Sequence, residues 1–346
     1  MDPGERRRLG GSDVQVTCFG FGGAPLGERF VRVSNEAADA IIETAYRVGI
    51  NYFDTAPQYG QGKSEARLGR VLQTKPRESY VLSTKVGHLY EPPADPAAFA
   101  TQLRGNGHHF AARSDYTRSG VMRSYEHSLL RLGLNRVDML VIHDLDVTHH
   151  GSRDKVDFHF RELLEGGGWK ALSELKRRGE IRAIGCGINQ LGQIPEVLDN
   201  CDVDFFLVAM PYTLLDQGAL DSELPLCQER GVSVVIGAVF ASGILATGAT
   251  DDASYGYGPA PPEVKAKVSA MEHVCAAHGV PLQAAALQFP MFHPAVAAII
   301  PGAHDSAILR HNLENFQLPI SPRLWHDLKA EGLIRPDAPV DRSQEK

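Results

Sequence analysis

The chain alternates between short apolar runs and amphipathic segments along most of its 346 residues. The apolar runs are rich in β-branched residues, and each one precedes a segment with helical spacing, such as 35–49 with Ala38, Ile41 and Ala45 on one face. The eight apolar runs lie at 16–23, 51–56, 80–87, 137–144, 181–188, 203–210, 232–239 and 295–302. Eight strands that each lead into a helix predict a parallel sheet.

The apolar runs are nearly continuous, as expected for strands that are covered on both faces. An open doubly wound sheet is the alternative, and it would need a glycine-rich phosphate fingerprint after an early strand. Segment 20–27 has Pro25 where the third glycine belongs, and segment 185–190 has Gln190 there. We therefore predict a single-domain (β/α)8 TIM barrel with its active site at the C-terminal mouth of the strands.

One domain is expected to cover residues 1–346, with a core at about 14–320 and a C-terminal tail at 321–346. Two connections, 88–116 and 144–168, are longer than ordinary loops. Both follow strands, so we expect them at the mouth of the barrel. Loops of this length in a compact domain are usually functional or disordered.

Composition excludes several classes of partner. The net charge is −7 and the pI is about 6.1, which argues against nucleic-acid or anionic-membrane binding. No run of apolar residues is long enough to span a membrane, and segment 1–11 lacks the apolar core of a secretory signal. The five cysteines are scattered, which indicates reduced thiols. We expect a cytoplasmic protein without a membrane or nucleic-acid partner, and homo-oligomerisation stays open.

Polar side chains stand where three neighbouring strands end. Asp54 ends the second strand and Tyr59 follows in its loop, Lys85 ends the third strand, and His143 ends the fourth. Asn189 follows the fifth strand. Because parallel barrels build their sites from the carboxyl ends of strands, these side chains are expected to meet at one rim.

This set suits proton transfer at a hydroxyl or carbonyl group. A free tyrosine has a pKa of about 10, and a neighbouring lysine would lower it, while an aspartate would hold that lysine in place. His143 would orient the substrate oxygen. None of the four side chains accepts two electrons, so a redox reaction needs a bound cofactor. The turn at Pro301–Gly302 opens a helix whose free N–H groups suit a phosphate.

These residues also allow a structural or a metal-binding interpretation. Taken alone, Asp54 and Tyr59 would more often be structural, but an ammonium such as that of Lys85 inside a barrel needs a partner. A second polar cluster contains His143, Asp144, Asp146, His149 and His150. Metal sites in barrels draw ligands from several strands, whereas these residues crowd into one connection. No metal is therefore expected.

Four segments together resemble the aldo-keto reductase superfamily: "GINYFDTAPQYGQGKSEARLG" at 49–69, "VLSTKVG", "VIHD" and "IIPGA". The resemblance covers about residues 6–320. It implies a barrel that uses a nicotinamide cofactor, with Tyr59 as acid/base, Lys85 and Asp54 tuning it, and His143 orienting the substrate. "MRSYEHSLLRLGLNRVD", "YTLLDQGAL" and "SGILATG" are similar to the branch of D-threo-aldose 1-dehydrogenase (L-fucose dehydrogenase) and pyridoxal 4-dehydrogenase. Both oxidise a cyclic hemiacetal to a lactone.

The resemblance also implies which residues contact the cofactor: Gly22, Gly23, Asn189, Tyr212, Ser242, Gly243, Leu245, Pro301, Gly302 and Asn312. Two departures from the family pattern matter. The tyrosine that stacks on nicotinamide is replaced by Gly237, so Tyr212 or Phe240 is expected to supply that surface. The cations that hold the 2′-phosphate of NADP are absent, because those positions are Gly302, Ala303 and Ile308. NAD is therefore the preferred cofactor and NADP the alternative.

The predicted function is oxidation of the C1 hydroxyl of a cyclic aldose, of the L-fucose or D-arabinose type, to its lactone with NAD as the hydride acceptor. The partner is thus a small sugar or hemiacetal. Three alternatives stay open: oxidation of pyridoxal to 4-pyridoxolactone, NADPH-dependent reduction of aldehydes, and a non-enzymatic role as a cofactor-sensing subunit.

Overall fold

The computed structural model describes residues 1–29, 31–100 and 106–341, and at its centre lies a sheet of parallel strands. The order of the strands is β14-β11-β10-β9-β8-β5-β4-β3. Their bounds are β3 Phe21–Gly22, β4 Tyr52–Asp54, β5 Val81–Val86, β8 Met139–Ile142, β9 Ala183–Ile188, β10 Phe205–Val208, β11 Ser233–Ile236 and β14 Val296–Ile299.

The first and last strands meet and close the sheet into a barrel. Parallel bridges join Phe19 to Ile299 and Gly22 to Gly302. The Gly22 N–H donates to the Pro301 carbonyl over 3.2 Å. A Cβ on Gly22 would lie 2.4 Å from the Ile300 carbonyl oxygen, so only glycine allows the two backbones to approach this closely. The predicted parallel barrel is confirmed.

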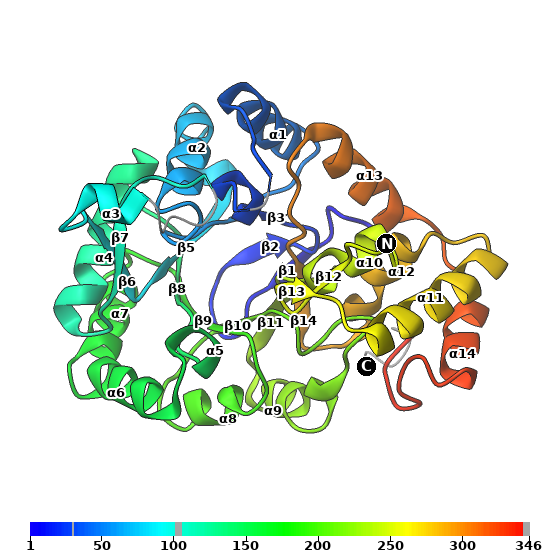
Figure 1. Ribbon diagram of the computed structural model, residues 1–346. Helices are drawn as coiled ribbons and strands as arrows, with labels where there is room; N and C mark the ends of the chain where they lie inside the picture. Colours follow the sequence, from blue (N-terminus) through cyan, green and yellow to red (C-terminus); the bar gives the residue numbers. More distant parts are fainter. Residues whose placement is uncertain (30, 101–105, 342–346) are drawn as a thin grey trace.

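The helices form an outer ring around the strands (Figure 1). Helix α1 illustrates how the sequence determines these helices. It starts after Ser34, whose side chain accepts the N–H of Ala37, and its apolar face buries Ala38, Ile41 and Ala45. The helices of this ring are α1 Asn35–Arg47, α2 Lys63–Leu72, α4 Arg118–Leu132, α7 Gly168–Arg177, α8 Gln193–Leu198, α9 Glu223–Arg230, α11 Pro262–Ala277, α12 Leu282–Gln288 and α13 Ser306–Gln317.

An N-terminal hairpin of β1 (Arg6–Arg8) and β2 (Gln15–Thr17) packs into the barrel interior. Its side chains Leu9, Val14 and Val16 belong to the same buried cluster as Tyr52 and Phe205 from the barrel strands. The expectation of one strand over 16–23 is therefore wrong. The first part of that segment pairs with β1 because its apolar side chains are buried against the barrel strands, and only β3 joins the barrel.

The two long connections at the mouth contain regular structure. The 88–116 connection holds the hairpin of β6 (His88–Glu91) and β7 (Ala111–Ser114), together with α3 Pro96–Ala100. The 144–168 connection holds α5 Val147–His150 and α6 Arg153–Leu164. The description of both as plain loops is corrected, although residues 101–105 lie outside the described part of the chain. A third hairpin, β12 (Ser254–Tyr255) and β13 (Gly258–Pro259), follows α10 Ile244–Thr247.

Buried residues extend beyond the expected core of about 14–320. Leu9 lies before it, and Leu324, Trp325 and Leu328 of α14 (Pro322–Ala330) lie after it, all within the buried interior. Part of the expected tail is therefore a packed helix, because the apolar face of α14 covers α11. The end of that tail, 342–346, lies outside the described residues.

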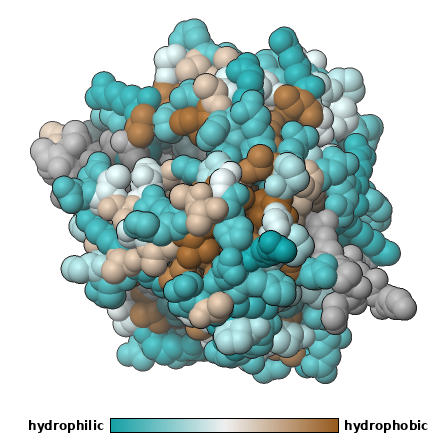
Figure 2. Space-filling model, turned by 90° about the vertical axis from the view of Figure 1, so that its right-hand side faces the viewer, coloured by the Kyte–Doolittle hydropathy of each residue, from teal (hydrophilic) through white to brown (hydrophobic). Residues whose placement is uncertain are grey.

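The surface is mainly polar. The face seen in Figure 2 carries mostly hydrophilic residues, with small hydrophobic patches between them. Among the described residues, none of the helices combines the length and the apolar character that crossing a membrane requires. The five cysteines are free thiols, and all of them are buried.

Candidate active site

A buried ion pair lies at the carboxyl ends of β4 and β5. The Lys85 ammonium donates to Asp54 Oδ2 over 2.7 Å and to the Thr55 carbonyl over 2.8 Å. The Ser83 hydroxyl donates to the other Asp54 oxygen over 2.6 Å. Both charged side chains are only 1% exposed. The pairing follows from the register of the neighbouring strands, in which Asp54 stands opposite Ser83.

Burial of this pair is costly unless each charge is fully compensated. Here the ammonium has two acceptors, and each carboxylate oxygen has a donor. The pair is therefore a fixed part of the barrel, and a Lys85 without Asp54 would be an unpaired cation in the protein interior.

Tyr59 lies on a turn between β4 and α2. Its N–H donates to the Ala56 carbonyl, and its own carbonyl accepts the N–H of Ser64 near the start of α2. The half-buried ring lies over Lys85, with Nζ 4.7 Å from the ring centroid. The ring meets His143 edge-on, at 6.0 Å between centroids. Asp54, Tyr59, Lys85 and His143 thus meet at one rim, as predicted.

The expected lowering of the Tyr59 pKa by Lys85 does not hold. Burial raises the pKa of Tyr59 well above 10, and the negative charges of Asp54 and Asp144 act in the same direction. The Lys85 cation cannot offset this effect because it is bound to Asp54 and lies against the face of the ring. Tyr59 is therefore a neutral phenol at neutral pH in this structure.

His143 follows β8 and is held by its backbone N–H, which donates to the Val86 carbonyl over 3.0 Å. The side chain is almost fully buried, and its Nδ1 has no hydrogen-bond partner. Burial lowers the pKa of His143 well below 6.5, and the charges of Lys85 and His149 add to this effect. A neutral imidazole with an unpartnered nitrogen is suited to bind a substrate oxygen.

Asn189 and two carboxylates lie beside His143. The Asn189 amide donates to Asp144 Oδ1 over 3.0 Å and to Asp146 Oδ2 over 2.7 Å. Asp146 also caps α5 by accepting the N–H of His149. Asp144 has a positive φ of 49°, a strained conformation for a residue other than glycine. Asn189 therefore orients the carboxylate that lies next to His143.

Sequence reasoning missed His88 as a residue of this region. Its ring centroid lies 5.7 Å from that of His143 and 4.6 Å from that of His149. Burial lowers the pKa of His88 well below 6.5. His88 could have been predicted from the sequence, because it follows Lys85 by three residues and so lies close to the end of the same strand.

The expected cofactor residues near β14 and α13 fit a bound nucleotide. Asn312 is buried and its Nδ2 has no partner, which is the state of a donor that a ligand would satisfy. Pro301 and Gly302 form the turn before α13, and Asp305 caps that helix by accepting the N–H of Ile308 over 2.8 Å. Gly22 and Gly23 are required first for packing, since a Cβ on Gly23 would lie 2.7 Å from the Asp54 carbonyl oxygen.

Ser242 and Gly243 lie after β11 in an unusual backbone conformation. Ala241, Ser242 and Gly243 all have positive φ, at 47°, 64° and 115°. The Ser242 hydroxyl accepts the N–H of Tyr257 over 3.1 Å and so ties the β12–β13 hairpin to this turn. Leu245 is fully buried, so its side chain packs in the core and only its backbone is suited to a ligand. Strain of this kind is typical of ligand-binding backbone.

Tyr212 does not supply the stacking surface for nicotinamide. Its ring is completely buried, and its neighbours are Phe289 and His293, at 5.6 and 5.9 Å between centroids. The expectation for Tyr212 is therefore corrected: packing against the helix layer leaves no free face. Phe240 is half-buried on the turn after β11 and is the remaining one of the two expected aromatic residues.

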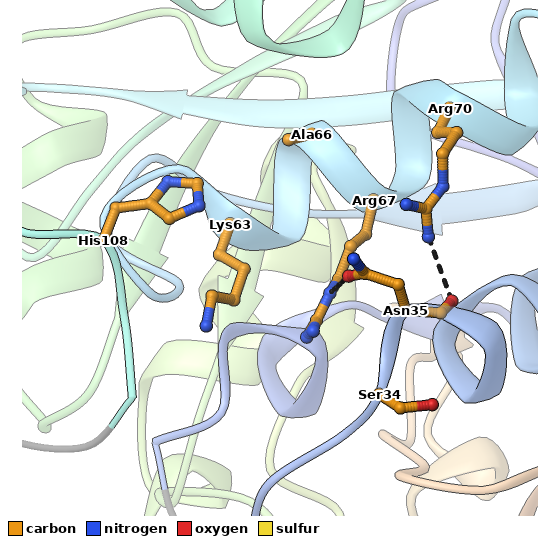
Figure 3. Close-up of a pocket in the computed structure, with 7 residues that line it drawn as sticks. All are labelled: Ser34, Asn35, Lys63, Ala66, Arg67, Arg70 and His108. Atoms are coloured by element: carbon orange, nitrogen blue, oxygen red, sulfur yellow. Dashed lines mark hydrogen bonds between the residues drawn. The ribbon is translucent and has the colours of Figure 1, made fainter.

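A cavity of about 490 Å³ lies between α1 and α2, outside the barrel. Its lining includes Lys63, Arg67 and Arg70, as Figure 3 shows. These cations are engaged within the protein: Lys63 and Arg67 pair with Glu28, and Arg70 pairs with Asp39. The cavity therefore offers little free positive charge to a ligand, and the strand ends remain the candidate active site.

The barrel and the polar residues at its mouth define an oxidoreductase that uses a nicotinamide cofactor. The profile of the aldo/keto reductase family matches residues 19–331, and the chain belongs to that family. Enzymes of this family use NAD or NADP, so the predicted class of enzyme is confirmed.

Similar proteins include dehydrogenases that are named for their substrates. Pyridoxal 4-dehydrogenase of Microbacterium luteolum is 40% identical over 338 residues, which cover 95% of this chain and 98% of that protein. D-threo-aldose 1-dehydrogenase of a Pseudomonas species is 36% identical, covering 93% and 95%. L-galactose dehydrogenase of Arabidopsis thaliana is 31% identical, covering 89% and 87%. The branch predicted from the sequence is confirmed.

Solved structures agree on the fold. An aldo-keto reductase from Bacillus halodurans in its holo form superposes with a TM-score of 0.73 at 24% identity and covers 99% of both chains. Glycerol dehydrogenase from Gluconobacter oxydans gives the same TM-score at 19% identity and covers 98% of both. At these identities the likeness supports the barrel alone.

The buried pair makes a prediction about stability. We expect Lys85→Met to lower the free energy of unfolding by about 3–5 kcal/mol, because it leaves the buried Asp54 unpaired. Asp54→Asn leaves Lys85 without its counter-charge and should lower the free energy of unfolding by less. The double variant should lose less than the sum of the two losses, because it leaves neither charge behind. Urea unfolding followed by circular dichroism measures all four proteins. Strict additivity would contradict the coupling.

Proposed function

We propose that this protein oxidises the C1 hydroxyl of a cyclic aldose to its lactone, with NAD as the hydride acceptor. The observation that carries the proposal is the buried Asp54–Lys85 pair directly beneath Tyr59, with neutral His143 against the same ring. This arrangement offers an acid/base phenol and an oxygen-binding imidazole in one place.

The proposed chemistry assigns one role to each side chain. His143 binds the substrate oxygen and orients it, and the phenolate form of Tyr59 takes the hydroxyl proton as the C–O bond becomes a carbonyl. Lys85 favours the phenolate that results from loss of the Tyr59 proton, and Asp54 keeps the lysine charged and in place. When bound, the oxidised nicotinamide supplies the acceptor for the hydride that leaves C1.

The cofactor would be held by two groups of residues. The Pro301–Gly302 turn precedes α13, and Asn312 lies in the middle of that helix with its Nδ2 unpartnered. The strained turn with Ser242 and Gly243 lies on the neighbouring strand end, since β11 pairs with β14. We propose that these groups, Asn189, the backbone of Leu245, and Gly22 and Gly23 contact the cofactor, as expected from the sequence, and that Tyr212 does not.

A sugar is favoured as substrate by polar groups next to Tyr59. Gln58 precedes Tyr59, and its Oε1 is buried without a partner, so a substrate hydroxyl would satisfy it. The relatives named for D-threo-aldose and L-galactose support the same class. Pyridoxal is the second candidate, because the relative named for it is 40% identical across nearly its whole length.

The direct test is absorbance of reduced nicotinamide with purified protein, NAD and each candidate substrate. We expect the band to grow with L-fucose, D-arabinose or L-galactose. Growth with pyridoxal alone would assign the second candidate. Consumption of NADPH with simple aldehydes, without any oxidation, would overturn the proposal.

Tyr59→Phe tests the mechanism in the same assay. We expect kcat to fall about 10²–10⁴-fold, because the variant has no group to accept the proton. The fold and the affinity for cofactor should be kept. Tyr46→Phe is the matched control, since the Tyr46 hydroxyl donates to Ser79 on the outside of the barrel. Full turnover in Tyr59→Phe would contradict the role of the phenol.

The raised pKa of Tyr59 makes a prediction about pH. Below that pKa the phenolate fraction falls tenfold for each pH unit, so kcat/KM for oxidation should rise with a slope of about one from neutral pH to about 10. His143 contributes no acidic limb in this window, because its pKa lies well below 6.5 and it stays neutral. A pH–rate profile measures this, and a plateau that begins near neutrality would be the opposite result.

NAD preference is supported by the charge at α13. Asp305 places a carboxylate at the N-terminus of the helix, where the 2′-phosphate of NADP would meet repulsion. We expect Asp305→Ser to raise kcat/KM with NADP by about tenfold, while serine keeps the helix cap. Asp327→Ser, on α14, is the control. Equal use of both cofactors by the unaltered protein would contradict the proposed preference.

A further inference from the structure

Two histidines and an aspartate from different strand ends converge at the mouth of the barrel. His88 follows β5, while His143 and Asp144 follow β8. One ligand atom from each lies within 4.8 Å of the others. The sequence argued against a metal site because the histidines after His143 lie in a single connection. His88 comes from a different strand, so that argument no longer applies.

We propose that His88, His143 and Asp144 form a binding site for a divalent transition ion of the zinc class, and that this ion blocks turnover. Imidazole and carboxylate are ligands that zinc accepts, and three protein ligands with an open position are typical of accessible zinc sites. Two imidazoles disfavour magnesium and calcium, which prefer oxygen ligands.

The distances suit such an ion after small side-chain rotations. His143 Nε2 lies 3.6 Å from Asp144 Oδ1. Bonds of about 2.0–2.2 Å in a tetrahedral site place neighbouring ligand atoms about 3.3–3.6 Å apart. His149 lies beside these three residues, with its Nδ1 3.7 Å from the second oxygen of Asp144, and is within reach of the position that they leave open.

Outer partners hold the ligands in place. The two nitrogens of His88 contact Ser114 over 3.3 Å and Tyr116 over 3.5 Å, so one can turn to the ion while the other stays anchored. Asn189 donates to Asp144. Hydrogen bonds of this kind orient metal ligands and tune their affinity.

The charge balance also favours a cation here. Lys85 is neutralised by Asp54, so its repulsion is offset, and the Asp144 carboxylate lies next to the histidines. A dication would bind this carboxylate and the His143 nitrogen that faces it.

An ion at this site occupies His143, which binds the substrate oxygen in the proposed reaction. Inhibition should therefore be competitive with the substrate. The proposal of a metal site itself does not require any particular substrate, and it is tested first without one.

Cobalt(II) is the probe, because it takes the place of zinc and absorbs visible light when tetrahedral. We expect the purified full chain to develop visible bands with equimolar cobalt, and zinc to abolish them. No intense cobalt–thiolate band should appear, since all five cysteines are buried. Absence of visible bands would overturn the site even if the aldose dehydrogenase assay succeeds, and their presence would stand even if that assay fails.

Variants locate the ion. We expect His88→Gln and His149→Gln each to weaken cobalt binding at least tenfold and to relieve zinc inhibition by a similar factor, measured against the turnover of the same variant in a metal chelator. His311→Gln is the matched control, since this side chain is 61% exposed on α13.

Unchanged binding in both variants would place the ion elsewhere and overturn the proposal. Circular dichroism checks that His88→Gln folds, because that side chain is buried. If it does not fold, the exposed His149→Gln and the spectrum of the unaltered protein decide the question.

Discussion

The ion pair between Asp54 and Lys85 is the interaction on which the mouth of this barrel depends. It joins two neighbouring strands at their carboxyl ends, and both charges are removed from solvent. A buried charge without its partner is strongly destabilising. The register of β4 and β5 must therefore keep Asp54 within reach of Lys85. The Tyr59 ring packs against this fixed pair through Lys85, and His143, which follows the next strand, contacts the edge of the Tyr59 ring.

Electrostatics at the mouth differ from what a simple count of charges suggests. His88 and His143 are buried strongly enough to be neutral, and Tyr59 is protonated for the same reason. The region therefore combines polar atoms with little net charge, apart from the carboxylates of Asp144 and Asp146. Such an environment strengthens each hydrogen bond to a ligand, and it makes each unpaired polar atom costly.

The sequence was informative where local patterns decide the outcome. The eight strands and the four strand-end residues could be placed because periodicity and strand ends are local features, and the motif spacing is specific. Other features depend on packing between distant segments. The segment 16–23 splits because Val16 is buried in the barrel interior, Tyr212 faces the helix layer, and the pKa of Tyr59 depends on burial. None of these can be deduced from spacing alone.

The seam between the first and last strands has a consequence for synthesis of the chain. Gly22 and Gly302 are bridged across nearly the whole sequence. The ribosome must therefore deliver about 300 residues before the ring can close, and until then the barrel strands from β3 to β11 form an open sheet with an exposed edge. Contacts of such long range slow folding, so the nascent chain depends on protection of that edge for most of its translation.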